Sequence, residues 1–343
     1  MSRIDLDLAH AYKPNPQRDE DYALLPLKMT FDDGGAYALL GPSGCGKTTL
    51  LNIISGLVKP SQGGVKFDGV EVKDKTPQQR NIAQVFQFPV IYDTMTVAQN
   101  LAFPLKNRGV PAERIKQRVG KIAEMLEMSA QLDMRAAGLA ADAKQKISLG
   151  RGLVREDVSA VLFDEPLTVI DPHLKWQLRR KLKQIHNELK LTLVYVTHDQ
   201  VEALTFADQV VVMTRGRAVQ IGTASELFER PRHTFVGHFI GSPGMNFLPA
   251  SLLPGAPAGA TKLGVRPEYV TLTAPNAVGA VAATVTQAQD IGTYWLVTAT
   301  VGDGAIVRAR LAPDRAIPKV GETVWLGIVG THTCFYKDEE LVA

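Results

Sequence analysis

Residues 41–48 read Gly41-Pro-Ser-Gly-Cys-Gly-Lys47-Thr48 and directly follow the apolar run Ala36–Leu40. The run predicts a buried strand, and the residues from Lys47 onward predict a helix. Glycines at this spacing let successive backbone N–H groups turn inward around a phosphate, and the start of the helix adds its positive end. The segment therefore predicts a phosphate-binding loop in which Lys47 bridges two phosphates and the Thr48 hydroxyl binds Mg²⁺. A glycine-rich turn that matches the pattern by chance is the alternative.

Acidic residues follow a second apolar run, Val158–Phe163, in the sequence Val161-Leu-Phe-Asp164-Glu165. A carboxylate at the end of a buried strand is costly unless a cation or hydrogen bonds meet it. We therefore expect Asp164 to hold Mg²⁺ and Glu165 to polarise an attacking water as a general base. A solvated acidic pair at the start of a loop is the alternative.

A histidine, His198, follows a third apolar run, Leu191–Val196. In a doubly wound sheet, ligands bind at the carboxyl ends of the parallel strands, which is where this residue is expected. Taken alone, a histidine at a strand end is more often a hydrogen-bonded surface residue. Its position after the third run nevertheless places it at the same sheet edge as the phosphate loop.

Apolar runs alternate with helical patterns over the first two-thirds of the chain, which predicts an α/β domain with a parallel sheet covered by helices. A mainly helical block spans about residues 96–156, and apolar residues recur with helical spacing from Leu174 to Ile185. After Phe228 the composition changes to proline, glycine and short β-prone runs, with a hairpin turn predicted at residues 302–304. The second domain is therefore expected to be a small β-barrel or sandwich.

Bulk properties narrow the range of functions. A chain of 343 residues is long enough for two domains, and 45% apolar with 21% charged residues is typical of a soluble protein. No apolar run approaches the roughly 20 residues that span a bilayer. A net charge of +3 gives no reason to expect a nucleic-acid partner. Met1–His10 lacks the order of a secretory signal, and two cysteines fit a reducing cytosol. Any membrane contact is therefore expected to go through a protein partner.

The order of these motifs resembles the ATPase subunits of ABC transporters, in particular the maltose-type importers that power carbohydrate uptake. The similar segments are the phosphate loop 41–48, Val85-Phe-Gln87, the signature region 139–153, Asp164-Glu165-Pro166, Leu167–Asp171, His198, Ile221–Phe228, Phe239–Phe247 and Gly264-Val-Arg-Pro-Glu268. Within this family, Gln84–Leu105 and the signature region look most like the paired ATPases of rhizobial glycerol uptake systems. The resemblance implies a P-loop ABC ATPase domain over residues 1–235 and an OB- or TOBE-like regulatory β-barrel over residues 236–343.

The resemblance also implies roles for individual residues with ATP and Mg²⁺. The implied catalytic residues are Glu165, His198, Gln87 and Lys47. The implied metal-binding residues are Thr48, Gln87 and Asp164. The implied nucleotide-binding residues are Tyr12, Gly41, Pro42, Ser43, Gly44, Cys45, Gly46, Lys47, Thr48, Thr49 and Gln87. Tyr12 best matches the aromatic residue that stacks on adenine, although it is also compatible with a packing role at a strand end, and Tyr22 is a weaker candidate because Lys13–Asp21 lengthens the connection.

The family's partners follow from the resemblance in the same way. It implies a second ATPase subunit, two transmembrane permease subunits, and a periplasmic solute-binding protein that acts through the permeases. The chain is accordingly expected to lie peripherally on the cytoplasmic side of the inner membrane. The alternatives are a soluble ABC protein that does not transport, and a different P-loop enzyme such as a small-molecule kinase.

The signature region departs from the family pattern Leu-Ser-Gly-Gly-Gln, because the sequence here is Leu139-Ala-Ala-Asp-Ala143. In the family this segment caps the γ-phosphate bound by the other subunit of the dimer. Ala140 has no hydroxyl, Ala141 replaces a glycine, and Asp142 is expected to cap the helix itself and repel phosphate. The alternative is that Asp142 is only an N-cap and that the helix still approaches the nucleotide. Gly150 and Gly152 in the same helix suggest a segment relaxed from the family's usual demands.

This altered signature favours a heterodimer, because a homodimer would carry two altered sites and a heterodimer with a normal partner only one. The residues that act on the partner's site would be Ala140, Ala141, Asp142 and Asp171. A homodimeric importer ATPase for a sugar or glycerol phosphate is the alternative. The transported solute stays open between sugar, polyol, glycerol and glycerol phosphate.

Overall fold

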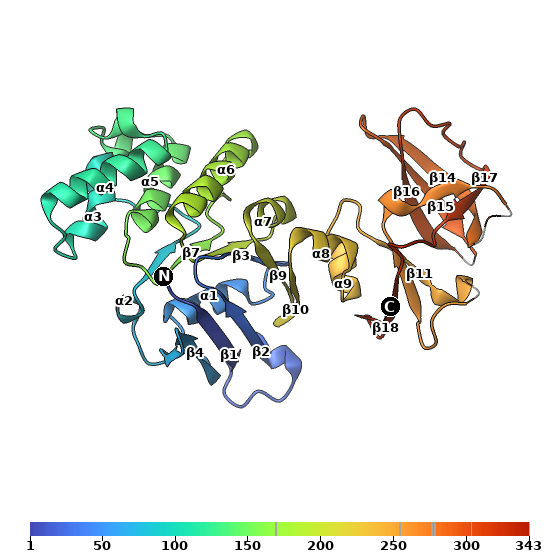
Figure 1. Ribbon diagram of the computed structural model, residues 1–343, viewed down its shortest axis with the longest axis horizontal. Coiled ribbons are helices and arrows are strands. Elements are labelled where there is room, and N and C mark those ends of the chain that lie inside the picture. The colour runs from blue at the N-terminus through green and yellow to red at the C-terminus, as the bar shows by residue number, and fades with distance from the viewer. Residues whose placement is uncertain (169, 254, 276, 278, 303, 343) are drawn as a thin grey trace. The chain divides into compact units, whose positions relative to one another are not determined.

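The three apolar runs pair in parallel within a six-stranded sheet. The computed structural model describes residues 1–342 except 169, 254, 276, 278 and 303 (Figure 1). The strand order is β10-β9-β3-β8-β7-β6, with every neighbouring pair parallel except β10 and β9. The strands are β3 (Ala36–Leu40), β6 (Ile82–Val85), β7 (Ala160–Asp164), β8 (Leu193–Thr197), β9 (Gln209–Thr214) and β10 (Arg217–Gly222). Because β3, β7 and β8 are almost wholly buried, they read as continuous apolar runs.

A second, antiparallel sheet covers helix α1 (Lys47–Ser55), so that this helix is buried between two sheets. The apolar side chains of α1 share one core with those of both sheets, including Leu6, Leu39, Leu50 and Val194. Arg80 is buried and donates hydrogen bonds to the backbone oxygens of Ile53 and Ile54 at the end of α1. The antiparallel strands are, in spatial order, β2 (Leu24–Phe31), β1 (Ile4–His10), β4 (Gln62–Phe67) and β5 (Val70–Glu71).

Helices cover the other face of the parallel sheet and form a second core with it. Residues 96–156 contain three of these helices, which gather in one layer in Figure 1. The helices of this unit besides α1 are α2 (Pro77–Arg80), α3 (Val97–Lys106), α4 (Ala112–Met125), α5 (Ala141–Leu153), α6 (Pro172–Leu189) and α7 (Gln200–Phe206). In α6, the expected apolar stripe is buried at Leu178, Leu182 and Ile185, whereas Leu174 is exposed.

The two glycines of α5 lie at close contacts, contrary to the expectation of a relaxed segment. A Cβ added at Gly150 would lie 2.5 Å from Leu101 Cδ2, and one at Gly152 would lie 2.7 Å from Val85 Cγ2. Helix α5 therefore packs tightly against α3 and β6, and glycine is needed at these positions for steric reasons.

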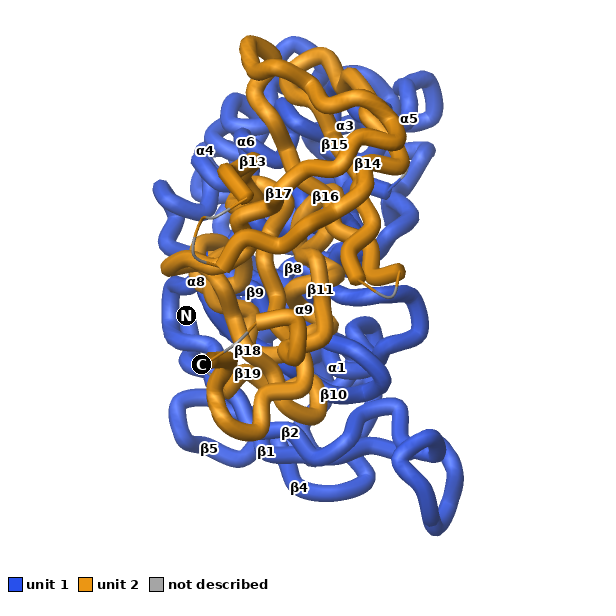
Figure 2. The backbone as a smooth tube through the Cα atoms, turned by 90° about the vertical axis from the view of Figure 1, so that its right-hand side faces the viewer, with its two compact units in different colours: residues 1–223 blue, residues 224–343 orange. Residues whose placement is uncertain are grey.

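The described residues divide into two compact units, residues 1–223 and 224–343 (Figure 2). The boundary that the family resemblance implies, after residue 235, lies inside α9 (Thr234–Phe239), which belongs to the second unit together with α8 (Ala224–Glu229). Arg266 supplies a reason. Its buried guanidinium donates hydrogen bonds to the backbone oxygens of Leu227, Phe228, Gly237 and Ile240. These bonds join α8 and α9 to the strand at Lys262–Val265, which Arg266 directly follows.

The second unit is β-rich, as its composition predicts, and holds two antiparallel sheets around one core. The turn predicted at residues 302–304 includes residue 303, which lies outside the described residues, but the strands on either side of it pair antiparallel. The five-stranded sheet is, in spatial order, β13 (Thr271–Thr273), β17 (Thr323–Gly327), β14 (Ala280–Asp290), β15 (Trp295–Val301) and β16 (Ala305–Leu311). The four-stranded sheet is β11 (Asn246–Pro249), β12 (Lys262–Val265), β18 (Cys334–Lys337) and β19 (Glu340–Leu341).

Two glycine-to-alanine changes, one in α5 and one in α4, should have opposite effects on the free energy of unfolding. Gly150→Ala forces a methyl group against Leu101 and should lower the free energy of unfolding by about 1–3 kcal/mol. Gly120→Ala is the matched control, because Gly120 is also helical and a Cβ there meets no atom within 4 Å. This control should raise stability by up to about 1 kcal/mol, since alanine favours helix over glycine. Denaturant unfolding of both variants measures the difference, and equal effects would contradict the packing argument.

Candidate nucleotide-hydrolysis site

The loop between β3 and α1 turns on two glycines with left-handed backbone conformations. Gly44 and Gly46 have φ of +79° and +104°, and a Cβ at Gly46 would lie 2.5 Å from the backbone oxygen of Ala23. Pro42, Ser43 and Gly44 are exposed, whereas Cys45 is buried and burial raises the pKa of its thiol. The loop thus turns outward on residues that only glycine suits, and it leads directly into the N-terminus of α1.

Lys47 is buried, and its ammonium group folds back over the loop. Its Nζ donates hydrogen bonds of 2.8 and 2.9 Å to the backbone oxygens of Gly41 and Pro42. These carbonyls hold the charged group at the mouth of the loop, where a phosphate would meet it. The contacts satisfy the buried cation without a carboxylate, which leaves its charge available for an anion.

Asp164 and Thr48 come together from different parts of the chain, as the sequence predicts. Thr48 Oγ1 donates a hydrogen bond of 3.2 Å to Asp164 Oδ1. Burial raises the pKa of the Asp164 carboxyl, and the adjoining Glu165 raises it further, while the Thr48 bond and Lys47 oppose the shift. A half-buried carboxylate that is costly to ionise, beside a hydroxyl ligand, fits a site for a divalent cation.

Glu165 and His198 also meet at this sheet edge. His198 Nδ1 lies 3.2 Å from Glu165 Oε2, and Thr168 Oγ1 donates to the same carboxylate oxygen at 3.3 Å. Glu165 has φ of +47°, a left-handed conformation that costs a non-glycine residue energy and turns the chain sharply after β7. The carboxylate is therefore aimed by its backbone and held by two neighbours, of which Thr168 was not predicted from the sequence.

His198 is itself positioned by its neighbours on the chain. Asp199 caps α7 by accepting from the backbone N–H groups of Val201 and Glu202. Thr197 Oγ1 donates 2.8 Å to the buried Glu202 carboxylate and accepts from the backbone N–H of Asp199. These bonds fix the turn from β8 into α7, so that the half-exposed imidazole extends from a rigid corner.

The remaining residues of the expected nucleotide site lie around this centre. Gln87 is half-buried and follows β6, whose Val85 pairs with Phe163, so Gln87 and Glu165 leave adjacent parallel strands at the same edge. Tyr12 is exposed, and its hydroxyl lies 3.2 Å from Thr49 Oγ1. Tyr22 instead accepts a hydrogen bond of 3.3 Å from Gln62 Nε2 on β4. Of these two tyrosines, Tyr12 therefore contacts the helix that follows the phosphate loop.

The start of α5 differs from the expectation for Asp142. The N-cap residue is Ala140, with no side-chain hydrogen bond to the helix, and Asp142 lies inside the first turn. The prediction that Asp142 caps the helix is therefore wrong, because the helix begins one residue before it. Asp171 does cap a helix, α6, by accepting 2.9 Å from the backbone N–H of His173.

A cluster that sequence reasoning did not find ties the segment after Gln87 to α5. Asn100 is fully buried. Its side chain accepts a hydrogen bond of 2.8 Å from the backbone N–H of Tyr92 and donates one of 2.9 Å to the backbone oxygen of Tyr92. Arg151 donates to Asn100 Oδ1 at 3.2 Å, and its guanidinium lies 4.7 Å from the centre of the Tyr92 ring. Lys144 pairs with Asp93 at 3.2 Å. No short-range sequence signal links Arg151 to Asn100 or Lys144 to Asp93, since 51 positions separate each pair.

Comparison with known proteins identifies the family of this chain. The ABC transporter family model matches residues 24–168, and the TOBE domain model matches residues 263–334. The sn-glycerol-3-phosphate import ATP-binding protein of Salmonella choleraesuis is 40% identical over 321 residues, covering 88% of this chain and 89% of that protein. The chain belongs to the ABC transporter family. It is an ATP-hydrolysing subunit of the carbohydrate-uptake type, with a C-terminal TOBE domain.

Two further ABC transporter proteins support this family assignment. The trehalose import ATP-binding protein of Mycobacterium tuberculosis is 43% identical over 284 residues, covering 82% of this chain and 69% of that protein. Among solved structures, cbiO1 of Clostridium perfringens, part of the ABC transporter complex cbiONQ, matches with a TM-score of 0.60 and 27% identity. That match covers 66% of this chain and 90% of cbiO1. Among the described residues of the ABC subunit, no helix is both long and apolar enough to cross a membrane.

The raised pKa of Asp164 predicts a pH-dependent gain of stability in Asp164→Asn. Folding raises the pKa of this carboxyl, so its ionised form lowers the stability of the folded state. This loss of stability is complete at a pH above the pKa in the folded state, and it vanishes at a pH below the pKa in the unfolded state. Without nucleotide or metal, Asp164→Asn should melt above the parent at pH 8, and the difference should shrink as the pH falls toward 4. Asp314→Asn, at an exposed position, is the control. Thermal unfolding measures both, and a gain that grows on acidification would contradict the assignment.

Proposed function

We propose that this ABC ATPase powers the import of a sugar, polyol or glycerol-type solute. The observation that carries the proposal is the meeting of Thr48 with Asp164 and of Glu165 with His198 at one sheet edge, beside the phosphate loop. Relatives that cover nearly the whole chain are importer subunits for sn-glycerol 3-phosphate and trehalose, which supports an uptake role. Since these relatives are named import ATP-binding proteins, the subunit is proposed to bind two transmembrane permeases on the cytoplasmic side of the inner membrane.

Each residue of this site has a separate proposed role in ATP hydrolysis. Lys47 and the glycine-rich loop bind the β- and γ-phosphates, and Tyr12 stacks on the adenine. Thr48, Asp164 and Gln87 would hold Mg²⁺, which neutralises phosphate charge. Glu165 takes a proton from the attacking water, and His198, within reach of Glu165, holds the γ-phosphate. The solute arrives through a periplasmic binding protein that contacts the permeases rather than this chain.

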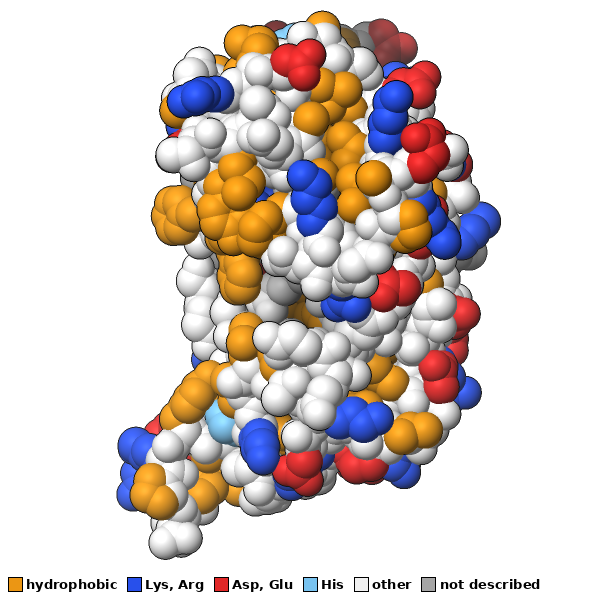
Figure 3. Space-filling view, turned by 90° about the vertical axis from the view of Figure 1, so that its left-hand side faces the viewer, with side chains coloured by type: hydrophobic (Ala, Val, Ile, Leu, Met, Phe, Trp, Pro, Cys, Tyr) orange, Lys and Arg blue, Asp and Glu red, His pale blue; other side chains and the backbone are white. Residues whose placement is uncertain are grey.

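Exposed apolar side chains after Gln87 support a permease contact. Phe86, Phe88, Val90 and Tyr92 are each at least 40% exposed, within seven consecutive residues. Such a concentration of exposed apolar side chains is typical of a protein interface. Figure 3, which shows the left-hand side of the view in Figure 1, has hydrophobic side chains gathered in patches between charged ones. We therefore assign residues 86–92 to the contact with the membrane subunits.

The altered signature supports a heterodimeric ATPase pair. In a dimer, Ala140, Ala141 and Asp142 would face the nucleotide held by the partner, with Asp171 beside them. Neither Ala140 nor Ala141 offers a side-chain donor, and Asp142 adds a negative charge in the first turn of α5. A partner with an ordinary signature would instead face the Lys47, Asp164, Glu165 and His198 site of this chain. One competent site per dimer follows.

Glu165→Gln tests the assignment of the base. In the complex purified from membranes with its partners, this variant should still bind ATP but hydrolyse it about 10²–10⁴-fold more slowly, because the amide cannot accept the proton. Glu188→Gln on α6, an exposed carboxylate paired with Lys121, is the matched control and should leave turnover unchanged. Undiminished turnover of Glu165→Gln means that another group is the base.

The same purification tests the partners. The proposal requires two hydrophobic permease subunits and a second ATPase chain to accompany this one. If this chain alone forms a dimer that hydrolyses ATP as fast as the mixed assembly, the heterodimer is wrong, while the ATPase assignment stands.

Arg151→Ala tests the link between residues 86–92 and α5. Loss of the Asn100 and Tyr92 contacts should uncouple the permease contact from the signature helix, so that stimulation of ATPase by the solute-loaded binding protein falls about tenfold. ATP binding by the isolated chain should persist, which distinguishes uncoupling from unfolding. Arg114→Ala removes a surface ion pair with Glu156 and is the control. Full stimulation in Arg151→Ala would contradict the coupling role.

A further inference from the structure

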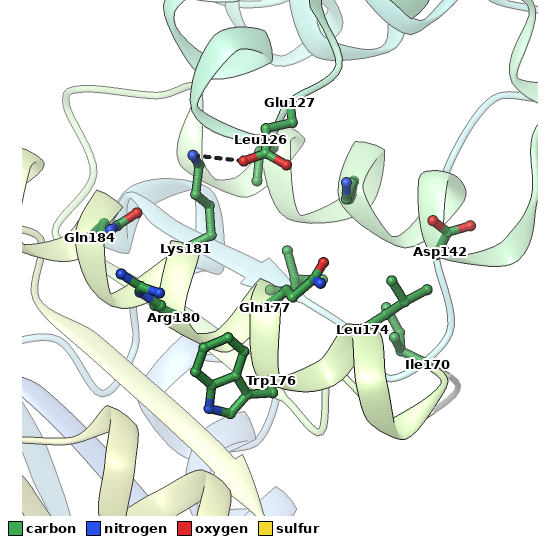
Figure 4. Close-up of a pocket in the computed structure, with 12 residues that line it drawn as sticks. Leu126, Glu127, Asp142, Ile170, Leu174, Trp176, Gln177, Arg180, Lys181 and Gln184 are labelled. Atoms are coloured by element: carbon green, nitrogen blue, oxygen red, sulfur yellow. Dashed lines mark hydrogen bonds and ion pairs between the residues drawn. The ribbon is translucent and has the colours of Figure 1, made fainter.

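A pocket outside the nucleotide site opens between α4, α5 and α6. Its cavity is about 340 Å³ and is lined by the end of α4, the first turns of α5, Ile170 and the exposed side of α6 (Figure 4). This volume falls within the range that holds a small organic molecule. None of the residues assigned above to binding this chain's own ATP lines it.

The floor of the pocket is apolar and its rim carries an exposed aromatic ring. Leu126, Ile170 and Leu178 are buried beneath it, whereas Leu174 and Trp176 on α6 are 38% and 55% exposed. Leu174 thus leaves the buried stripe predicted from its spacing and lines the cavity instead. A tryptophan left this exposed gives up apolar burial that an occupant would restore.

The charges around the pocket are unevenly compensated. Lys181 pairs with Glu127 at 3.1 Å, and Lys146 lies close enough to Glu127 to lower the pKa of that carboxyl further. Arg180 has no carboxylate partner among the described residues; its guanidinium lies 5.7 Å from the centre of the Trp176 ring. Asp142 is likewise without an ion pair in the described part of the chain, and it lies across the view from Arg180 in Figure 4. The end of the pocket at Arg180 therefore favours a negative group, and the end at Asp142 disfavours a second negative group.

We propose that this pocket binds a small organic anion with a flat apolar body and a single negative group. The body stacks on Trp176, and the anionic group meets Arg180 beside the same ring. The end of the molecule that faces Asp142 is neutral or carries a hydrogen-bond donor, since a second negative charge there would be repelled.

The position of the pocket gives its occupant a regulatory role, which rests on the proposed function. Asp142 belongs to the first turn of α5, and Ile170 directly precedes Asp171, the two segments proposed to act on the partner's nucleotide. An occupant braces α5 against α6 and so changes the turnover of the ATPase pair. Binding itself does not depend on that role and is measured separately.

Titration of the purified chain with 8-anilino-1-naphthalenesulfonate, a flat apolar monoanion, tests the site. We expect saturable fluorescence, with the dissociation constant raised about tenfold in Trp176→Ala and in Arg180→Ala. Bound dye should also slow hydrogen exchange in peptides from residues 141–146 and 170–184, and not in the strand at 62–67. Lys116→Ala, an exposed cation on α4 outside the pocket, is the matched control and should bind like the parent.

Each outcome decides the proposal. Equal dissociation constants for the parent, Trp176→Ala and Arg180→Ala place the dye elsewhere and overturn it, as does slowed exchange confined to other segments. Retained ATP affinity in both variants shows that they are folded. An intact dye site in a chain that binds no nucleotide would refute the proposed function and leave the pocket assignment standing.

Discussion

The parallel pairing of β3, β8 and β7 is the constraint on which the rest of the site depends. These strands are buried on both faces, and the residues proposed to act on the nucleotide lie at or just beyond their carboxyl ends. Pairing in register then brings those ends to one edge. Thr48 meets Asp164 and Glu165 meets His198 although more than 30 residues separate each pair.

Local backbone conformation converts this shared edge into a reactive arrangement. Gly46 adopts a φ that admits no side chain, which lets α1 begin at Lys47, and Glu165 adopts a left-handed φ that turns its carboxylate toward His198. The buried Arg80 anchors the far end of α1. Burial also makes the Asp164 carboxylate costly to ionise, and a divalent cation bound there would offset that cost.

Helix α5 connects three features that are distant in the sequence. Its first turn carries the altered signature, Arg151 near its end holds the segment after Gln87 through Asn100, and its glycines press it against α3 and β6. A tightly packed helix moves as a unit, because close-packed interiors do not deform continuously. A displacement at the exposed apolar segment 86–92 would therefore reach the signature, and the pocket beside Asp142 lies on the same helix.

The sequence by itself determined the phosphate loop, the buried strands and the acidic pair, because glycine spacing and apolar runs are local signals. It also determined the β-rich second unit and the family. Only the tertiary structure decided that Ala140 and not Asp142 is the N-cap of α5, that Gly150 and Gly152 serve packing, and that Leu174 lines a pocket instead of a core. The contact between the buried Asn100 and the half-buried Arg151 was likewise decided only by the tertiary structure. Each of these features depends on which part of the protein packs against a residue. Long-range packing determines that neighbour, and the spacing of residues in the sequence carries no information about it.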